Sequence, residues 1–182
     1  MQFSKKKLLR LMTKKHLIYY FTALLLLIFS EGCKVNYSFT GASISPEVKT
    51  ISIKYFQNKA PLVQPTLSQK FTDALKDKFT SQTNLQLINS GGDLHVEGEI
   101  VGYSTQPVAI QANETASLNR LSVSVNVRFT NRFDEKQNYE TTFRRYQDYD
   151  SKLSLSSVED ALLDEINEQL VEDIFNKAVV NW

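Results

Sequence analysis

A histidine and a glutamate two residues apart, His95 and Glu97, are the pair in this chain that is best placed for chemistry. Apolar and polar residues alternate along residues 94–103, so both polar side chains are expected on the outward face of a strand. A His-x-Glu pair on a strand can begin a metal site, yet after residue 32 the only further histidine or cysteine is Cys33. We therefore expect His95 to be an exposed polar residue, with no metal ion and no cofactor.

Nucleophilic catalysis finds no more support in the sequence. The chain contains neither a glycine-rich phosphate loop nor the G-x-S-x-G turn of serine hydrolases. A Ser-His-Asp triad would have to use His95, and no surrounding pattern favours that use. The sequence therefore predicts a protein that is not an enzyme.

Four arginines near one predicted hairpin form the densest group of cations after residue 32: Arg128, Arg132, Arg144 and Arg145. The planar guanidinium group can bind a phosphate through two parallel hydrogen bonds, so these residues are candidates for contacting the phosphates of a glycolipid. The alternative is a cross-strand ion pair such as Arg128 with Glu140, which would contribute only about 0.2–1 kcal/mol. The sequence leaves both interpretations open.

The start of the chain has the features of an export signal. Residues 17–29 form an apolar run, which is shorter than the about 20 apolar residues that a membrane-spanning helix needs. Six cations precede this run with no acidic residue among them: Lys5, Lys6, Lys7, Arg10, Lys14 and Lys15. A basic segment followed by a short apolar one is typical of a signal peptide.

The chain's one cysteine, Cys33, directly follows Gly32 just after this run, and the site resembles the lipobox of bacterial lipoproteins. The usual pattern has a leucine and a small residue where this chain has Ser30 and Glu31. The resemblance implies that diacylglycerol is attached to the Cys33 thiol and that the chain is cut after Gly32. The alternative is a buried or free thiol, but a lone cysteine in an exported protein has no disulfide partner within the chain.

Acylation would anchor the protein without a membrane helix, since each buried methylene contributes about 0.8 kcal/mol. The predicted organisation is a signal peptide over residues 1–32, an acylated tether over residues 33–46 and one domain over residues 47–182. Removing the first 32 residues leaves 15 of the chain's 21 basic residues and 19 of its 20 acidic ones, a net charge of minus four. Such a domain is a poor candidate for binding nucleic acid, which needs clustered cations.

Alternating residues predict a series of strands. Residues 48–56 place Ile51, Ile53 and Tyr55 on one face. Residues 94–103 place two glycines, Gly98 and Gly102, on the core side, which indicates that something bulky, most simply a helix, packs there. Further strands are expected over residues 85–88, 121–129 and 139–146, the last two as a long antiparallel hairpin, while residues 107–119 lack clear periodicity.

Two helices are expected, each opened by a capping box. Thr66 and Gln69 would cap the first helix, whose apolar stripe is formed by Leu67, Phe71, Ala74, Leu75 and Phe79. Ser156 and Glu159 would cap the second, which can continue to the chain end. Its polar face carries seven acids that we expect to face water: Glu159, Asp160, Asp164, Glu165, Glu168, Glu172 and Asp173. The predicted fold class is an α+β two-layer sandwich, with two helices on one face of a mixed four- or five-stranded sheet.

Several segments, taken in order, resemble the lipopolysaccharide-assembly lipoprotein (LptE) family. They are residues 37–44, 49–56, 66–71, 92–94, 98–100, 102–103 and 173–182. The likeness covers nearly the whole chain after Cys33, and the order and spacing of the segments carry it more than any one motif does.

The resemblance implies a non-enzymatic outer-membrane lipoprotein that faces the periplasm. Members of the family plug a large β-barrel partner, LptD, help it to assemble, and bind lipopolysaccharide during its delivery to the cell surface. Lipid-binding cations of the family do not map residue by residue onto this chain. The alternative is an anchored periplasmic adaptor or carrier for another lipid or protein, because a fold alone does not determine a function.

Overall fold

The structure is a computed structural model, and it describes residues 44–62, 64–108 and 117–180. The predicted signal peptide, Cys33 and the tether as far as residue 43 lie outside the described residues. The strands are β1 (Thr50–Ile53), β2 (Gln57–Asn58), β3 (Gln86–Ile88), β4 (Leu94–Val108), β5 (Leu118–Asn131) and β6 (Tyr139–Asp150). The helices are α2 (Leu67–Gln82), the short 3-10 helix η1 (Glu135–Gln137) and α3 (Leu155–Val179).

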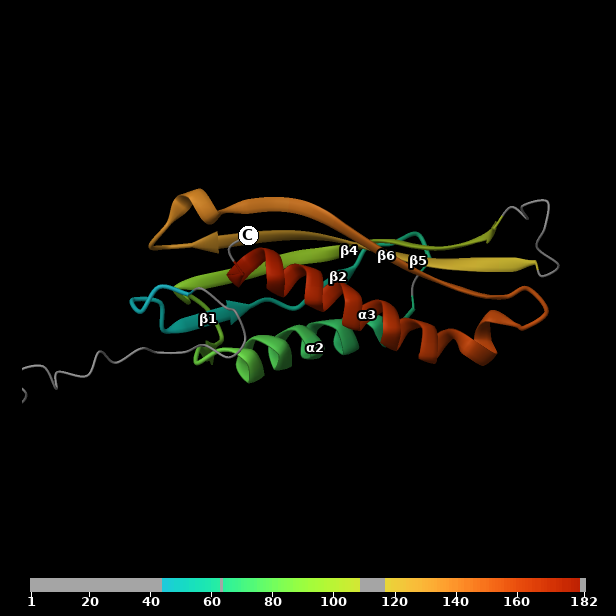
Figure 1. The fold of residues 1–182 in the computed structure, drawn as a ribbon, viewed down its shortest axis with the longest axis horizontal. Coiled ribbons are helices and arrows are strands. Elements are labelled where there is room, and N and C mark those ends of the chain that lie inside the picture. Colours follow the sequence, from blue (N-terminus) through green and yellow to red (C-terminus); the bar gives the residue numbers. More distant parts are fainter. Residues whose placement is uncertain (1–43, 63, 109–116, 181–182) are drawn as a thin grey trace, which may run out of the picture. The chain divides into compact units, whose positions relative to one another are not determined.

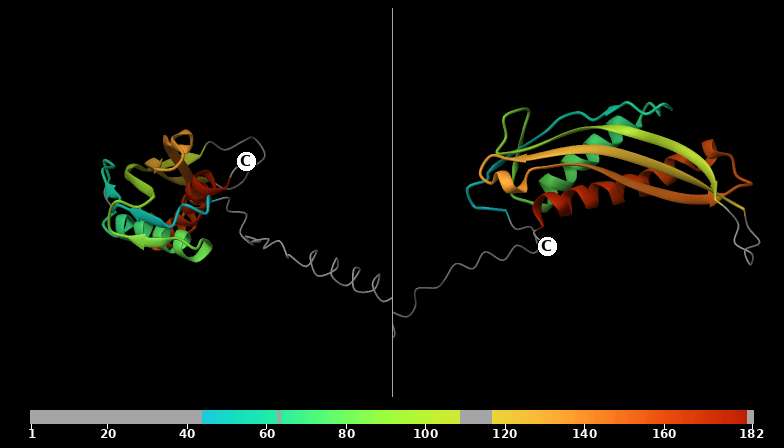
Figure 2. Two further views of the ribbon diagram at one scale, coloured as in Figure 1. Left: turned by 90° about the vertical axis from the view of Figure 1, so that its left-hand side faces the viewer. Right: turned by 90° about the horizontal axis from the view of Figure 1, so that it is seen from above.

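The described strands form one mixed sheet in the order β3-β1-β4-β5-β6, with β2 paired to β4. Strand β1 runs parallel to β3 and β4, whereas β4, β5 and β6 form an antiparallel meander. Helices α2 and α3 lie side by side on one face of the sheet, and no described α-helix covers the other face, which we call the helix-free face (Figures 1 and 2). The predicted α+β fold with two helices on one face is confirmed.

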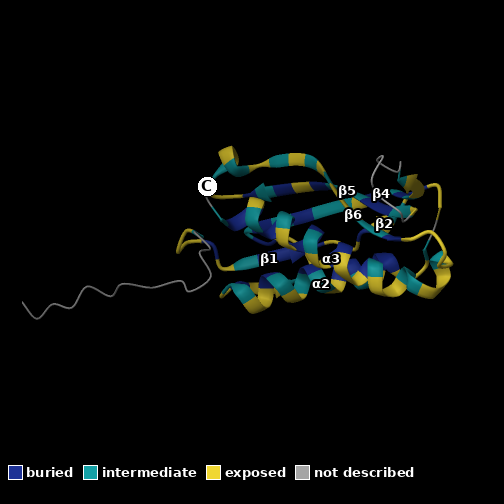
Figure 3. Cartoon of the chain, turned by 45° about the vertical axis from the view of Figure 1, so that its right-hand side comes forward, coloured by how far each residue is buried: buried dark blue, intermediate teal, exposed yellow. Residues whose placement is uncertain are grey.

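The core lies between the helices and the covered face of the sheet (Figure 3). The predicted α2 stripe supplies four fully buried side chains: Leu67, Phe71, Leu75 and Phe79. Phe71 and Phe79 meet Phe56 and Phe175 edge to face, with ring centroids 5.1 and 5.2 Å apart. Edge-to-face contacts are a preferred geometry of aromatic pairs, so these rings join the loop after β1, α2 and α3 into one packed layer.

Strand β1 is shorter than its alternating sequence predicts. It ends at Ile53, so the expected burial of Tyr55 is wrong: this side chain is 50% exposed, and Phe56 is fully buried instead. The backbone N–H of Phe56 donates to the Thr72 hydroxyl of α2 at 3.1 Å, which fixes the chain where it leaves the sheet. A tertiary hydrogen bond therefore overrides the period of two.

Strand β4 contains an irregularity between Ile100 and Gly102 that changes which residues face the core. Tyr103 is buried after it, and Gly102 lies opposite Ser124 instead of facing a helix, so the expected core position of Gly102 is wrong. Gly98 does face a bulky group. A methyl group there would lie 2.1 Å from the carbonyl oxygen of Asn126 and 2.6 Å from the ring of Phe56, so the bulky group is an aromatic side chain rather than a helix backbone.

The capping box predicted for the first helix is wrong. Thr66 stands at the cap position but makes no side-chain capping bond. The side-chain oxygen of Gln64 takes that role, because it accepts from the backbone N–H groups of Thr66 and Leu67 at 2.7 and 3.1 Å. An amide two residues before the cap therefore satisfies donors that the helix leaves unpaired.

The second capping box is also wrong, because the cap is Ser154 and α3 begins at Leu155, two residues earlier than a cap at Ser156 would place it. The Glu159 carboxylate is used elsewhere: it accepts a hydrogen bond from the hydroxyl of Tyr103 on β4. Burial and this bond raise the pKa of the tyrosine. The glutamate thus ties the first turns of α3 to the sheet.

The acidic face of α3 faces water, as expected, because five of its seven acids are exposed, although several of them also form ion pairs. Lys70 of α2 lies 3.2 Å from both Asp160 and Asp164, and Lys78 pairs with Glu172. Glu165 and Glu168 remain exposed, as expected. Ion pairs this exposed contribute about 0–1 kcal/mol each, so they align the two helices more than they stabilise them.

The strands of the meander extend further than the alternating pattern indicates. β4 continues to Val108, β5 begins at Leu118, and β6 ends at Asp150. The predicted irregular segment 107–119 therefore begins and ends within the sheet, and its middle, residues 109–116, lies outside the described residues. Neither described helix is long and apolar enough to cross a membrane.

Candidate functional site

The helix-free face of the sheet carries most of the polar side chains that the sequence marks for function. Strand β5 buries Val123, Val125 and Val127 on the covered face, and α3 contacts this strand. Because successive side chains point to opposite faces, Asn126 and Arg128 lie on the helix-free face. The register places Glu97 and Glu140 on either side of Arg128.

A row of alternating charges crosses the helix-free face and is formed by Lys54, Glu97, Arg128 and Glu140. Lys54 donates to Glu97 at 2.7 Å, and Arg128 lies 3.3 Å from both Glu97 and Glu140. The hydrogen bond from Lys54 is the main reason that the pKa of Glu97 is lowered. The cross-strand pair of Arg128 with Glu140, left open by the sequence, is present. More than half of the Arg128 side chain is still exposed, so a further anion can reach it.

His95 lies beside this row and has two neighbours. Its Nδ1 is 2.7 Å from the Ser52 hydroxyl, and its Nε2 is 3.4 Å from Glu97. This resembles a Ser-His-acid arrangement, but Ser52 is fully buried and accepts a hydrogen bond from the backbone of Gly92. No substrate can reach that hydroxyl. Among the described residues, no group of three or more possible ligands lies close enough to hold a metal ion.

Arg144 and Arg145 point to opposite faces of β6. Arg145 forms a bidentate ion pair with Asp173 of α3, with both N–O distances at 2.6 Å. Arg144 lies opposite Ser124 on the helix-free face, is exposed, and makes no hydrogen bond or salt bridge with a described residue. The structure therefore brings Arg128 and Arg144 onto one face and directs Arg145 to a structural contact.

Arg132 lies apart from the other three, in the turn between β5 and β6. Its backbone N–H donates to the carbonyl of Asp93 at 3.0 Å, and its charge helps to lower the pKa of the Asp93 carboxyl. The larger causes of that shift are hydrogen bonds from the backbone of Lys49 and the hydroxyl of Thr50. The four predicted arginines thus occupy three separate places.

One arginine of the helix-free face was missed by the sequence analysis. Arg120 binds Asp148 on β6 through two hydrogen bonds of 2.7 and 2.8 Å, and its guanidinium lies 3.6 Å over the ring of Tyr146. Arg120 holds the pKa of Asp148 below its ordinary value. Counting back along the hairpin from Arg128 opposite Glu140 would have found this pair, because the same register places Arg120 opposite Asp148.

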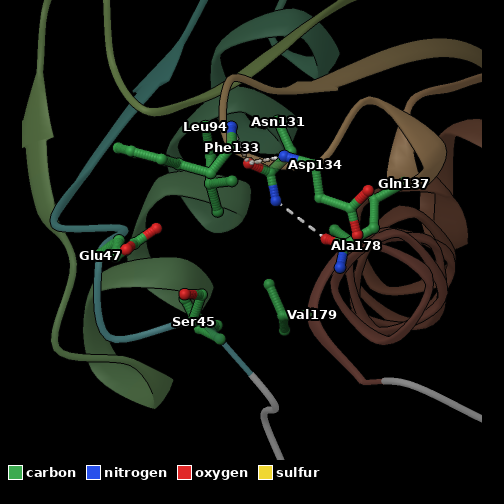
Figure 4. A pocket seen from close by; sticks show the side chains of 10 residues that line it. Ser45, Glu47, Leu94, Asn131, Phe133, Asp134, Gln137, Ala178 and Val179 are labelled. Carbon is green, nitrogen blue, oxygen red and sulfur yellow. Dashed lines mark hydrogen bonds between the residues drawn. The ribbon is translucent and has the colours of Figure 1, made fainter.

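A pocket of about 270 Å³ lies at the end of the sheet where the described chain begins (Figure 4). The turn after β5, the end of α3 and the first described residues form its wall. The Asn131 side chain spans the back of the pocket and donates to Gln137 at 2.9 Å. The lining residues are Ile44, Ser45, Glu47, Leu94, Asn131, Phe133, Asp134, Gln137, Ala178 and Val179.

The chain matches one family model, described as lipopolysaccharide-assembly (LptE), over residues 48–178. This span starts just before β1 and ends one residue before the end of α3. No curated protein matches the chain.

Solved structures with similar folds have low sequence identity. A hypothetical protein from Chlamydia trachomatis is 11% identical, with a TM-score of 0.50 over 74% of this chain and 99% of that one. A protein from Xanthomonas campestris is 8% identical, with a TM-score of 0.50 over 76% and 90%. A minor lipoprotein from Acinetobacter baumannii is 16% identical, with a TM-score of 0.47 over 72% and 92%. At these identities the likeness concerns the fold alone.

Proposed function

Because the chain belongs to the lipopolysaccharide-assembly (LptE) family, we propose that it is an outer-membrane lipoprotein that binds lipopolysaccharide and assembles with the β-barrel translocon LptD. One observation carries the proposal: the family match spans the whole sheet and both helices of the described domain. The proposed role is non-enzymatic. The burial of Ser52 beside the domain's one described histidine, His95, supports this, because the arrangement most like a catalytic triad is closed to substrate.

The pocket at the end of the sheet is a poor site for the lipid. Its volume of about 270 Å³ lies below the roughly 300–1,000 Å³ that is usual for drug-sized ligands, and lipopolysaccharide is larger than those. A surface contact fits better. On the helix-free face, Arg144 is exposed and without a partner among the described residues, and Arg128 keeps an exposed side chain beside its two acids.

The lipid contact can be tested by changing these two arginines together. The double variant Arg128→Ala with Arg144→Ala should weaken binding of purified lipopolysaccharide, and the loss should shrink as salt is raised, because salt screens exposed charges. Its thermal midpoint should stay within a few degrees of the parent's, as expected at exposed positions. Arg145→Ala is the matched control, since that side chain pairs with Asp173. Equal affinity in the double variant and the parent would contradict this site.

The barrel partner can be tested by co-purification. Full-length protein is extracted from outer membranes in detergent and captured, and the bound proteins are identified. We expect a large β-barrel protein to be recovered in comparable amounts. Capture of the lipoprotein with no barrel would contradict the translocon role and favour the anchored carrier or adaptor that the sequence leaves open.

The anchor is a separate part of the proposal, and it rests on Gly32 and Cys33. Cells fed a labelled fatty acid should label the parent protein and not Cys33→Ser, which should remain as an uncut precursor. Equal label in both proteins would rule out acylation at this cysteine. The proposed contacts with lipopolysaccharide and with the barrel would not be affected by that result.

A further inference from the structure

The turn between β5 and β6 exposes a large aromatic side chain at the end of the sheet where the chain enters the domain. Phe133 is 52% exposed, although the turn around it is firmly held. The side-chain oxygen of the buried Asn131 accepts from the backbone N–H of Phe133 at 2.9 Å, and the backbone N–H of Asn131 donates to the side-chain oxygen of Asn138 at 2.7 Å. The turn therefore fixes the position of an exposed aromatic ring, and burying such a ring in an apolar environment is favourable.

The position of this turn identifies the partner. Ile44, the first described residue, lines the same pocket as Phe133. Cys33 lies eleven residues before Ile44, and eleven residues can span at most about 40 Å. Strands of 12 to 15 residues separate this end of the sheet from the opposite end, which lies about 40–50 Å further away. A lipid on Cys33 would therefore keep the Phe133 end within reach of the bilayer.

The turn from Asn131 to Asn138 carries two cations and two acids. Arg132 and Lys136 flank Phe133, are exposed, and form no salt bridge with a described residue. The Asp134 carboxylate is occupied within the turn, where it accepts from the backbone of Lys136 at 3.1 Å. Asp134 keeps its negative charge when it accepts this bond, and Glu135 is exposed, so the two acids balance the two cations and the aromatic ring supplies the main contact.

We propose that the turn from Asn131 to Asn138 is a membrane contact, in which Phe133 enters the bilayer interface and Arg132 and Lys136 meet lipid phosphates. The proposal rests on the lipid anchor of the proposed function and adds an orientation to it. The Phe133 end of the domain faces the bilayer, and the loop between β6 and α3, which exposes Leu153, faces away.

Single-tryptophan variants of the full-length protein test this orientation. The chain's one tryptophan is first removed by Trp182→Phe, and then Phe133→Trp or Leu153→Trp is added. The two positions are similarly exposed, at 52% and 49%, and lie at opposite ends of the sheet, so each is the control for the other. Each protein is reconstituted into vesicles of phosphatidylethanolamine and phosphatidylglycerol with brominated acyl chains, without any barrel protein.

We expect tryptophan at position 133 to emit at shorter wavelength and to be quenched at least about twofold more than tryptophan at position 153. Equal quenching at both positions, or stronger quenching at 153, would overturn the proposal. Omitting phosphatidylglycerol should reduce the quenching at 133, and an unchanged value would remove the two cations from the contact. Failure of the protein to float with vesicles would overturn anchor and contact together, whereas loss of barrel co-purification alone would leave both standing.

Discussion

The two faces of the sheet hold the same strands in different ways. The covered face is apolar: Val123, Val125 and Val127 are buried beneath α3. The helix-free face carries a row of paired charges around Arg128, in which the side chains of Lys54, Arg128 and Glu140 are each more than half exposed. Burial of an apolar side chain contributes about 1.5–3 kcal/mol, whereas an exposed ion pair contributes about 0–1 kcal/mol. The covered face therefore maintains the fold, and the helix-free face can be changed for binding at little cost in stability.

The largest expected effect is on the covered face. Leu170 of α3 is fully buried, so Leu170→Ala should lower the free energy of unfolding by about 2–5 kcal/mol, measured by urea denaturation. Leu153→Ala is the matched control at a side chain that is 49% exposed, and it should change little. Similar losses in both variants would mean that the difference between buried and exposed leucines does not decide stability here.

A smaller effect is expected where the sheet meets the Phe56 ring. A methyl group at Gly98 would lie 2.6 Å from that ring and 2.1 Å from the carbonyl of Asn126, so Gly98→Ala should cost about 1–3 kcal/mol. At Gly102 the nearest atom is the Ser124 Cβ at 3.1 Å, and Gly102→Ala should cost less. Thermal unfolding of both variants gives the order, and a greater loss at Gly102 would contradict the close packing of Asn126 and Phe56 around Gly98.

Substitutions at the adjacent residues Arg144 and Arg145 allow a direct comparison of the two faces, because their side chains point to opposite faces of β6. Arg145→Ala removes the bidentate pair with Asp173 and should lower stability by about 0.2–1 kcal/mol, a small value because the arginine side chain is 44% exposed. Arg144→Ala removes no hydrogen bond or ion pair with a described residue and should leave stability unchanged. Chemical denaturation at low and high salt checks this, since only the Arg145 effect should shrink in high salt.

The smallest effect concerns pH. The folded pKa of Glu97 is lowered, chiefly by Lys54, so its contribution to stability is present above its ordinary pKa of 4.5 and is lost as pH falls through the lower folded value. Glu97→Gln should therefore be slightly less stable than the parent at neutral pH. The difference should vanish below the folded pKa. Urea denaturation at neutral and strongly acidic pH measures it, and a difference that grows on acidification would contradict the assigned shift.

The fold was predictable because it depends on local periods. The alternation around Val125 and the helical spacing from Leu67 to Phe79 assign residues to faces without knowledge of the partner. What failed depends on distant contacts. The end of β1 is set by Thr72 of α2, the cap of α2 by a Gln64 side chain, and the core position of Tyr103 by an irregular strand. None of these leaves a periodic signal.

The candidate site was predictable in part. Alternation along β6 already separates Arg144 from Arg145, so their assignment to opposite faces could have been made from the sequence. The partner of Arg145 could not have been predicted from the sequence, because Asp173 lies 28 residues away on a helix whose placement over β6 depends on the whole core. The pocket beside Phe133 likewise joins the two ends of the described chain, Ile44 and Val179, and no local pattern relates them.

The parallel pairing of β1 with β3 and β4 has a consequence for how the chain is made. Strand β4 pairs with β5 and β5 with β6, so the meander forms in the order of synthesis. Strand β1 is made first among the described strands, but Ile53 finds its partner only when Val96 has appeared. Distant pairings form slowly. Strand β1 therefore remains unpaired while α2 is synthesised. A chaperone that shields extended apolar segments would have its best target at Ile51 and Ile53.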